Sequence, residues 1–374
     1  MEKLTLAQTI DGIEPASKEY EELARKQIED IAMPPWALGK LCDLAVTLAG
    51  IERKVKPTVD KKIILTMAAD HGVAEDGVSA FPQEVTVQMA QNILLGGAGV
   101  NVLGRAAGAE VRLTDMGIKE DISCLPGAEN LQIVKIAPGS ENMHTGPAMT
   151  REQAVAALEA GINIANQAGA DGAQLLGTGD LGIGNTTPSA AILSVMADIP
   201  VAEATGRGTG VDDEGLRAKI RVIEESIELN KPDKNDAVDV LSKVGGYDIA
   251  GIAGSILGAA YNRVPIFIDG FISTAGALIA LGLCPTAADY MLPSHRSQEP
   301  GHDRMWKAIG KEPLLDLNFR LGEGTGGAVA MHLAECACRI ANDMLTFSDA
   351  GVTNADSVTV DTFADGQQLN EKDA

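Results

Sequence analysis

The sequence predicts an α/β fold, in which a parallel β-sheet is flanked by helices and a small helical lobe is formed by the N- and C-terminal segments. Short apolar runs alternate with stretches of helical length, which is typical of a parallel sheet covered on both faces. Several of these runs stop at a glycine and an aspartate, as strands entering loops do. With 45% apolar residues among 374, the chain can build a large core.

The N-terminal residues predict helices. Apolar positions recur with helical spacing over 16–31, and residues 37–49 show a second such pattern that ends at Gly50. We therefore assign residues 1–50 to the small lobe.

Residues 51–330 predict one large domain. Alanine-rich stretches at 152–168 and 274–281 are expected to form helices between its strands. Ligands of parallel sheets bind beyond the carboxyl ends of the strands, so the functional loops are expected there. The expected strands are 62–69, 110–115, 132–136, 173–176 and 264–268.

The C-terminal residues 331–374 are expected to complete the lobe. Residues 327–346 predict one long helix, and the tail from about 364 is polar and expected to fray.

The net charge of the chain limits the classes of partner that it is expected to bind. There are 52 acidic and 30 basic residues, which gives a formal net charge of −22. A field of that sign repels phosphate backbones and anionic lipids, so neither nucleic acid nor a membrane surface is expected as a partner. No apolar run reaches the ~18 residues of a membrane span, and no signal-peptide pattern is present. The five cysteines are odd in number and sparse, so we expect a soluble protein of a reducing, cytoplasmic compartment.

A first glycine-rich loop, GTGDLGIGNTTP at 177–188, lies between an expected strand and a helix. Thr187 is expected to cap that helix and Pro188 to occupy its first position. Free amides and the helix dipole there predict phosphate binding. The letters GTGDLG also match the dinucleotide-binding pattern, but five residues intervene before the helix and the expected acidic residue is missing. A nicotinamide-dependent oxidoreductase is therefore disfavoured.

A second glycine-rich loop, GRGTGVDD at 206–213, precedes a helix that contains Lys219. Lys219 lies about one turn beyond Gly215, from where it could reach a phosphate held at the loop. A solvated lysine on an exposed helix face is the alternative that the sequence leaves open.

A third segment, RLGEGTGG at 320–327, places Glu323 among four glycines and near Arg320. Turn formation does not require a glutamate there, and a carboxylate enclosed by backbone could have its pKa tuned for proton transfer. The alternative is a structural pairing of Glu323 with Arg320.

Two other chemistries are weakly indicated. SHRS at 294–297, with His71, suggests a Ser/His hydrolase, but the G-x-S-x-G motif is absent. Acidic residues and a histidine at 70–76 could bind a metal ion, but they lack complete ligand spacing. We expect neither a metal nor a cofactor.

Seven segments together resemble the nicotinate-nucleotide–dimethylbenzimidazole phosphoribosyltransferase family, which prepares the lower ligand of cobalamin. They follow the family's order across roughly residues 30–345. The segments are 68–89, 177–191, 206–213, 241–260, 267–273, 292–302 and 320–330.

This resemblance implies a Rossmann-like core, a small lobe built from both termini, and a homodimer. It also implies a reaction: the ribose phosphate of nicotinate mononucleotide passes to dimethylbenzimidazole with inversion, nicotinate leaves, and α-ribazole phosphate forms. Positioning and one base suffice for this chemistry.

The resemblance further implies site residues. Glu323 would accept the proton of the attacking base. Asp180 would be a second catalytic carboxylate, one methylene shorter than the glutamate that the family often has there. The nucleotide would lie against Gly182, Gly184, Asn185, Gly208, Thr209, Gly210, Lys219, Ser297, Arg320, Leu321 and Gly322, and the aromatic base against Phe81, Pro82 and Met89.

The identity of the base stays open at this point. In the segment PPWALGKLCDL at 34–44, Trp36 and Ala37 replace a Gly-Ser pair of the family. Benzimidazole, adenine or a phenol are alternatives to dimethylbenzimidazole. A phenol- or p-cresol-activating subunit of a heterodimer is one alternative function, and a catalytically idle nucleotide-binding subunit is another.

Overall fold

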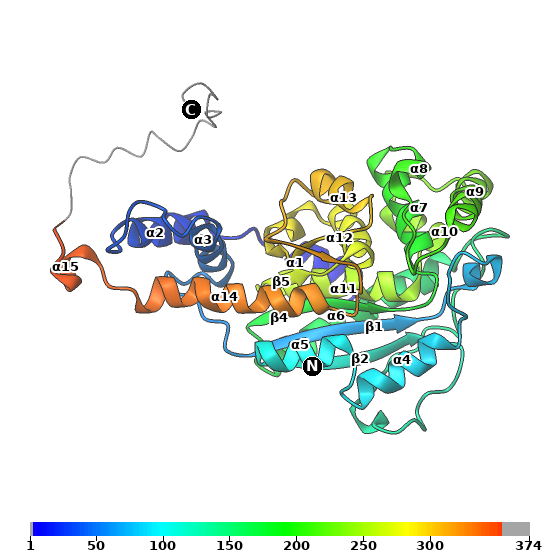
Figure 1. Cartoon of the computed structure of the whole chain (residues 1–374), viewed down its shortest axis with the longest axis horizontal. Helices are drawn as coiled ribbons and strands as arrows, with labels where there is room; N and C mark the ends of the chain where they lie inside the picture. Colours follow the sequence, from blue (N-terminus) through cyan, green and yellow to red (C-terminus); the bar gives the residue numbers. More distant parts are fainter. Residues whose placement is uncertain (1–2, 354–374) are drawn as a thin grey trace, which may run out of the picture.

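The computed structural model describes residues 3–353, and a six-stranded sheet with helices on both faces dominates it (Figure 1). The strand order is β3-β2-β1-β4-β5-β6, and all neighbours are parallel. This confirms the predicted α/β class. The strands are β1 (Lys62–Ala69), β2 (Ala109–Gly117), β3 (Gln132–Ile133), β4 (Leu175–Leu181), β5 (Ile266–Ile268) and β6 (Met291–Pro293).

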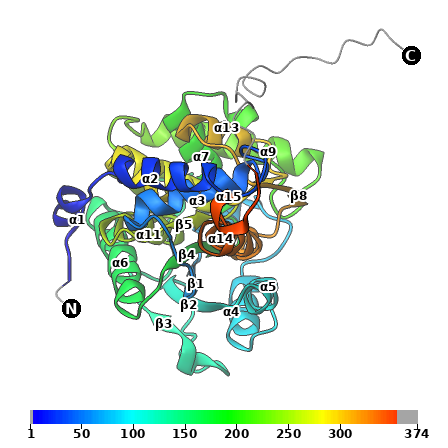
Figure 2. The ribbon, with the colours of Figure 1, turned by 90° about the vertical axis from the view of Figure 1, so that its left-hand side faces the viewer.

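Two helical layers cover the sheet, and Figure 2 shows them from one end. Helices α11 and α12 pack on one face of the sheet, and α6 packs on α11. Helices α4, α5 and α14 contact the strands from the other face (Figure 2). The bounds are α4 (Val85–Leu94), α5 (Gly99–Ala107), α6 (Arg151–Ala170), α7 (Thr186–Ala197), α8 (Val201–Ala204), α9 (Asp213–Asn230), α10 (Ala237–Val244), α11 (Tyr247–Tyr261), α12 (Phe271–Leu283), α13 (His302–Ile309) and α14 (Thr325–Asp343).

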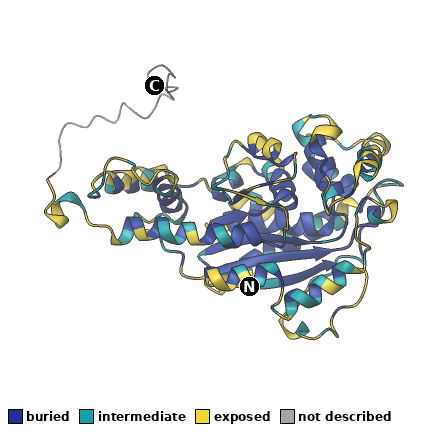
Figure 3. Ribbon diagram, in the orientation of Figure 1, coloured by how far each residue is buried: buried dark blue, intermediate teal, exposed yellow. Residues whose placement is uncertain are grey.

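The strand predictions succeed where apolar runs are long. β1 has the predicted bounds, and every residue of β1 and β4 is buried, as Figure 3 shows for the centre of the sheet. The predicted end of β4 at residue 176 is wrong, because the strand continues to Leu181 through glycines that look like a loop. The predicted strand 132–136 is reduced to two residues. The short strands β6, β7 (His295–Ser297) and β8 (Leu315–Phe319) give no apolar signal of that length.

Helices from the N-terminal and C-terminal parts of the described chain meet in a group at one end of the molecule, opposite α7 and α9 (Figure 1). Helices α2 (Lys18–Glu29) and α3 (Lys40–Glu52) pack on each other and on α14, and α15 (Phe347–Ala350) follows. An antiparallel bridge joins Ile31 to Thr346. We call this group the terminal lobe.

Two features differ from the expected division of the chain. Helix α1 (Leu6–Gly12) packs on α6 and α11 of the large domain, and the Leu6 amide donates to the Glu159 carboxylate. Helix α14 crosses the expected boundary at 330 without interruption and serves both parts. We therefore keep the boundaries at residues 50 and 330 only as a proposal. The polar tail expected from about 364 lies outside the described residues.

Within residues 3–353, no helix is both long and apolar enough to cross a membrane.

Helices α6 and α11 are held unusually close by glycine. A Cβ atom on Gly161 would overlap the carbonyl oxygen of Gly251, and one on Gly254 would overlap the carbonyl oxygen of Leu158. The two backbones are therefore in direct contact, so a side chain at either position would push the helices apart.

We expect Gly161→Ala to lower the free energy of unfolding by about 1–3 kcal/mol, because the new methyl group overpacks the α6–α11 contact. Gly169→Ala in the same helix is the matched control, since the nearest atom to its Cβ would be 3.7 Å away. That control should be neutral or stabilising by up to about 1 kcal/mol. Urea unfolding measures both, and equal stability of the two variants would contradict the close contact.

Candidate active site

A cavity of about 370 Å³ lies at the carboxyl ends of β4 and β5, where open α/β sheets bind ligands. Its walls come from β4 and the start of α7, the start of α12, and the loop between β8 and α14. A larger cavity of about 590 Å³ lies between the N-terminal segment, β3 and α6. Its lining has a single acidic and a single basic side chain, Glu159 and Lys3, so the smaller cavity is the better candidate.

The cavity gathers most of the residues that the sequence singled out. It is lined by Phe81, Met89, Asp180, Gly182, Asn185, Gly208, Thr209, Ser297, Arg320, Leu321, Gly322 and Glu323. Pro82, Gly184, Gly210 and Lys219 do not line it. The sequence reasoning considered His295 only for a hydrolase, and it missed Val85, Leu181, Ile183, Thr186, Gly270, Phe271, Ile272 and Glu299. Most of these are apolar or lie in short elements whose place only the fold reveals.

Glu323 is enclosed as expected. It is 5% exposed, and its Oε2 accepts a hydrogen bond from the Val100 amide at 3.1 Å, at the N-terminus of α5. Its backbone is left-handed, with φ of +64°, and its carbonyl oxygen accepts from Thr66 Oγ1 at 3.0 Å. A Cβ on Gly179 would overlap that oxygen, which explains the glycine inside β4.

Burial raises the pKa of Glu323 above its usual value, and the Asp269 carboxylate acts in the same direction. The hydrogen bond from Val100 opposes the shift. A carboxylate with a raised pKa at the wall of a cavity suits a general base.

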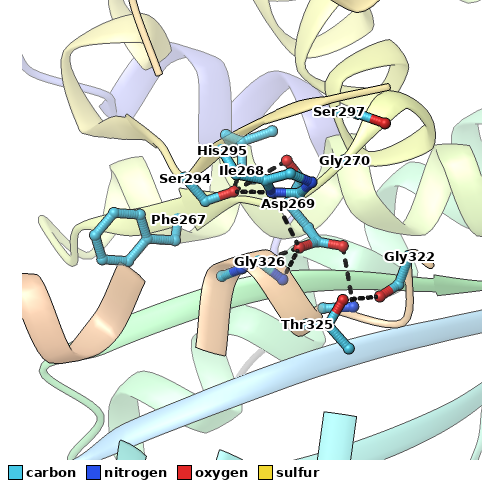
Figure 4. Close-up of polar contacts among 12 residues, drawn as sticks. Phe267, Ile268, Asp269, Gly270, Ser294, His295, Ser297, Gly322, Thr325 and Gly326 are labelled. Carbon is cyan, nitrogen blue, oxygen red and sulfur yellow. Dashed lines mark hydrogen bonds and ion pairs between the residues drawn. The ribbon is translucent and has the colours of Figure 1, made fainter. Parts of the chain in front are cut away.

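A second carboxylate, Asp269, fixes the loop that carries Glu323 (Figure 4). Its Oδ2 accepts from the Gly324 amide at 3.1 Å, and its Oδ1 accepts from Gly326 at 2.7 Å and Gly327 at 2.9 Å. These amides begin α14, so the positive end of that helix is already occupied by a side chain.

Ser294 and His295 do not form a hydrolytic pair. Ser294 is fully buried, and its hydroxyl donates to the carbonyl of Ile268 at 2.7 Å (Figure 4). Its Oγ lies 3.0 Å from His295 Nδ1, but a hydroxyl so enclosed cannot reach a substrate in the cavity. The Ser/His alternative is therefore not supported.

Asp180 lies at the end of β4 beside the backbone of Gly322 and is 6% exposed. Its Oδ2 accepts from Asn185 Nδ2 at 3.2 Å. Burial raises the pKa of Asp180 well above its usual value, and the carboxylates of Asp269 and Asp248 add to that shift.

The two glycine-rich loops meet at Lys219. This lysine is fully buried, which contradicts the alternative of a solvated side chain, and its Nζ donates to Thr186 Oγ1 at 2.6 Å. Gly208 must be a glycine here, since its φ is +53° and a Cβ would lie 2.7 Å from Thr186 Oγ1. The Gly208 amide donates to Glu299 Oε1 at 3.0 Å.

The expected cap of α7 is displaced. The helix begins at Thr186 and Asn185 occupies the cap position, so Thr187 and Pro188 lie inside the first turn. The helix N-terminus still faces the cavity, because Asn185 and Thr186 line it.

An apolar side of the cavity is formed by Phe81, Val85, Met89 and Leu181. Phe81 is 52% exposed, and Leu321, which also lines the cavity, is 61% exposed. Such a surface suits a planar aromatic ligand. Among residues 3–353, no group of three or more His, Cys, Asp or Glu side chains is arranged to hold a metal ion.

Known proteins share this chain's sequence and fold. A family model described as phosphoribosyltransferase (DBI_PRT) matches residues 13–352. A protein of Syntrophotalea carbinolica called nicotinate-nucleotide–dimethylbenzimidazole phosphoribosyltransferase is 52% identical over 345 residues, which cover 92% of this chain and 98% of that protein. A Geobacter sulfurreducens protein of the same name is 51% identical over 351 residues, covering 94% and 99%. The crystal structure of CobT from Thermus thermophilus has a TM-score of 0.85 and 42% identity, covering 90% of this chain and 99% of that one.

The buried cation predicts how phosphate binding depends on pH. Burial lowers the pKa of Lys219 to about 8, so the site loses its positive charge as the pH rises through that value. We expect a phosphate monoester to bind more weakly at pH 9 than at pH 7, since its own second ionisation, near pH ~6, is complete at both. Calorimetric titration measures the affinity.

Lys219→Met should bind the same ligand weakly and almost equally at the two pH values. An equal loss of affinity with pH in Lys219→Met and wild type would assign the dependence to another group.

Proposed function

This chain belongs to the DBI_PRT phosphoribosyltransferase family, and from that membership we propose that it transfers the phosphoribosyl group of nicotinate mononucleotide to dimethylbenzimidazole. The products are nicotinate and α-ribazole 5′-phosphate, which serves the nucleotide loop of cobalamin. The observation that carries the proposal is one cavity lined by a buried carboxylate, Glu323, by residues of two glycine-rich loops and by apolar side chains.

The phosphate of the nucleotide binds where the two glycine-rich loops meet. Thr186 and Gly208 line the cavity there, with the Lys219 ammonium group directly behind Thr186. The N-terminus of α7 adds a positive dipole end, and Ser297 and Arg320, which also line the cavity, supply further donors. Nicotinate mononucleotide is thereby held by its phosphate with its ribose toward Glu323.

The aromatic base binds against Phe81, Val85, Met89 and Leu181. One of its ring nitrogens forms a bond to C1′ of the ribose as the bond from C1′ to the nicotinate nitrogen breaks. The proton on the other ring nitrogen passes to Glu323, and nicotinate leaves with the electron pair of the broken bond. Because attack comes from the face opposite the leaving group, the product has the inverted configuration.

Asp180 is the second carboxyl group of the reacting centre. C1′ becomes cation-like as nicotinate departs, and a nearby carboxyl oxygen stabilises that charge. Its place beside Gly322 puts it in the same wall as Glu323.

We also propose a cytoplasmic homodimer. All five cysteines are free, which suits a reducing compartment. Leu38 and Leu345 of the terminal lobe are 41% and 58% exposed, and Phe81 and Leu321 at the cavity are also exposed. A second subunit that packed on these side chains would remove their apolar surface from water.

Incubation with nicotinate mononucleotide and one base at a time tests the activity. We expect ribotide from dimethylbenzimidazole, read by mass, together with an equal amount of released nicotinate. Ribotide from phenol or p-cresol alone would instead favour the phenol-activating relatives, and absence of any ribotide would refute the transferase proposal for this chain alone.

Glu323→Gln should retain affinity for nicotinate mononucleotide within about twofold and lose about a hundredfold or more in kcat, because it keeps the shape but accepts no proton. The matched control is Glu52→Gln in the terminal lobe, another buried glutamate with a burial-raised pKa. Steady-state kinetics measures kcat, and calorimetry measures the affinity for nicotinate mononucleotide. Turnover of Glu323→Gln at the rate of the control would remove Glu323 from the mechanism.

Light scattering after gel filtration should give twice the chain mass of 38.9 kDa. Leu345→Glu places a charge on the exposed apolar surface of the lobe and should shift the protein toward monomer. A wild-type mass of one chain would exclude the homodimer.

A further inference from the structure

A chain of buried polar side chains leads from the cavity wall into the protein. It runs from Asp180 through the amide of Asn185 to Asp248 and ends at His71, and each of the four is at most 6% exposed. Asn185 Nδ2 donates to Asp180 Oδ2 at 3.2 Å and to Asp248 Oδ2 at 3.3 Å. His71 Nε2 lies 3.1 Å from Asp248 Oδ1. The reaction proposed above gives no part to Asp248 or His71.

The imidazole of His71 is wedged between two glycines. A Cβ on Gly246 would overlap its Cε1 atom, and one on Gly182, in the cavity wall, would lie 3.1 Å from its Nε2 atom. Neither ring nitrogen has a well-oriented hydrogen bond within the described residues. The short contact between His71 Nε2 and Asp248 Oδ1 is therefore the polar contact that offsets the burial of this ring.

Asp248 controls which way the Asn185 amide faces. It lies in the first turn of α11, where its Oδ1 accepts from the Ile249 amide at 2.8 Å, and a helix N-terminus favours an ionised carboxylate. An ionised carboxylate only accepts hydrogen bonds, so Asn185 must present its NH₂ group to it. That group has two hydrogens, and the second one goes to Asp180.

We propose that His71 and Asp248 are positioning residues for Asp180, acting through the Asn185 amide; this inference rests on the function proposed above. The amide donates to Oδ2 of Asp180, while Oδ1 is buried without a hydrogen-bond partner among the described residues, so the amide is the polar contact that orients this carboxyl group. Without an ionised Asp248 the amide is free to turn over. Its carbonyl oxygen would then face Asp180, and the hydrogen bond from Nδ2 to Oδ2 would be lost.

His71→Gln tests the proposal, with ribotide formation as the activity. We expect kcat to fall about tenfold or more, as is usual when a partner behind a functional group is lost. KM for nicotinate mononucleotide should stay within about twofold, because the phosphate contacts are elsewhere. The exposed His332 provides the matched control, His332→Gln, which should behave as wild type.

The double variant separates positioning from packing. If His71 acts through Asp180, then His71→Gln combined with Asp180→Asn is no slower than Asp180→Asn alone. Three results would each overturn the inference. The losses of kcat in the two single variants could multiply in the double variant, or His71→Gln could raise KM instead of lowering kcat, or it could leave kcat unchanged. If thermal unfolding shows that His71→Gln is unfolded, Asp248→Asn replaces it, because asparagine keeps the side-chain shape. Its kinetics, alone and combined with Asp180→Asn, then test the proposal.

The wild-type enzyme is assayed first, so that a failure of the proposed function can be told apart from a failure of the positioning proposal. A wild type that forms no ribotide refutes the proposed function. A wild type that turns over while His71→Gln and Asp248→Asn match it refutes only the positioning chain.

Discussion

The active-site cavity depends on the contact between the Asp269 carboxylate and the amides that begin α14. Asp269 follows β5 directly, and it accepts hydrogen bonds from Gly324, Gly326 and Gly327. A helix N-terminus favours a negative acceptor, so this contact fixes the helix against the sheet without any ligand. The loop just before the helix is thereby held over β4, with the Glu323 carbonyl against Gly179. The burial of Glu323, its hydrogen bond from Val100 and its raised pKa follow from that placement.

The cavity has two electrostatic ends that match the charges of the proposed substrate. The carboxyl groups of Asp180, Asp269 and Glu323 gather at one end. Burial raises the pKa of all three, and the charge of Asp269 adds to the shift at the other two. Lys219, which lies behind Thr186, supplies positive charge at the glycine-rich loops, where the Glu299 carboxylate accepts from Gly208. A phosphate suits the positive end, and a carbon that becomes cation-like suits the negative one. Burying several like charges costs stability, which is usual at sites shaped for chemistry.

The sequence alone was sufficient for the fold class, which rests on local patterns, and the resemblance to a known family supplied most of the cavity residues. β1 is a continuous apolar run, and the glycine-rich loops mark strand ends. It misplaced the end of β4, because Gly179 serves a contact with a residue far along the chain. It also left the burial of Lys219 undecided and gave no sign that His71 and Asp248 meet. Contacts between distant segments depend on packing, and no local spacing encodes them.

Helix α14 joins two parts of the molecule that are otherwise far apart. Its first turn is locked to Asp269 and follows Glu323 directly, and its later turns pack on α2 and α3 of the terminal lobe. At about 1.5 Å per residue, its 19 residues make a rod of roughly 28 Å. One helix therefore carries both the Asp269 contact and the contacts of the terminal lobe. We expect a displacement of the lobe to reach the loop that holds Glu323.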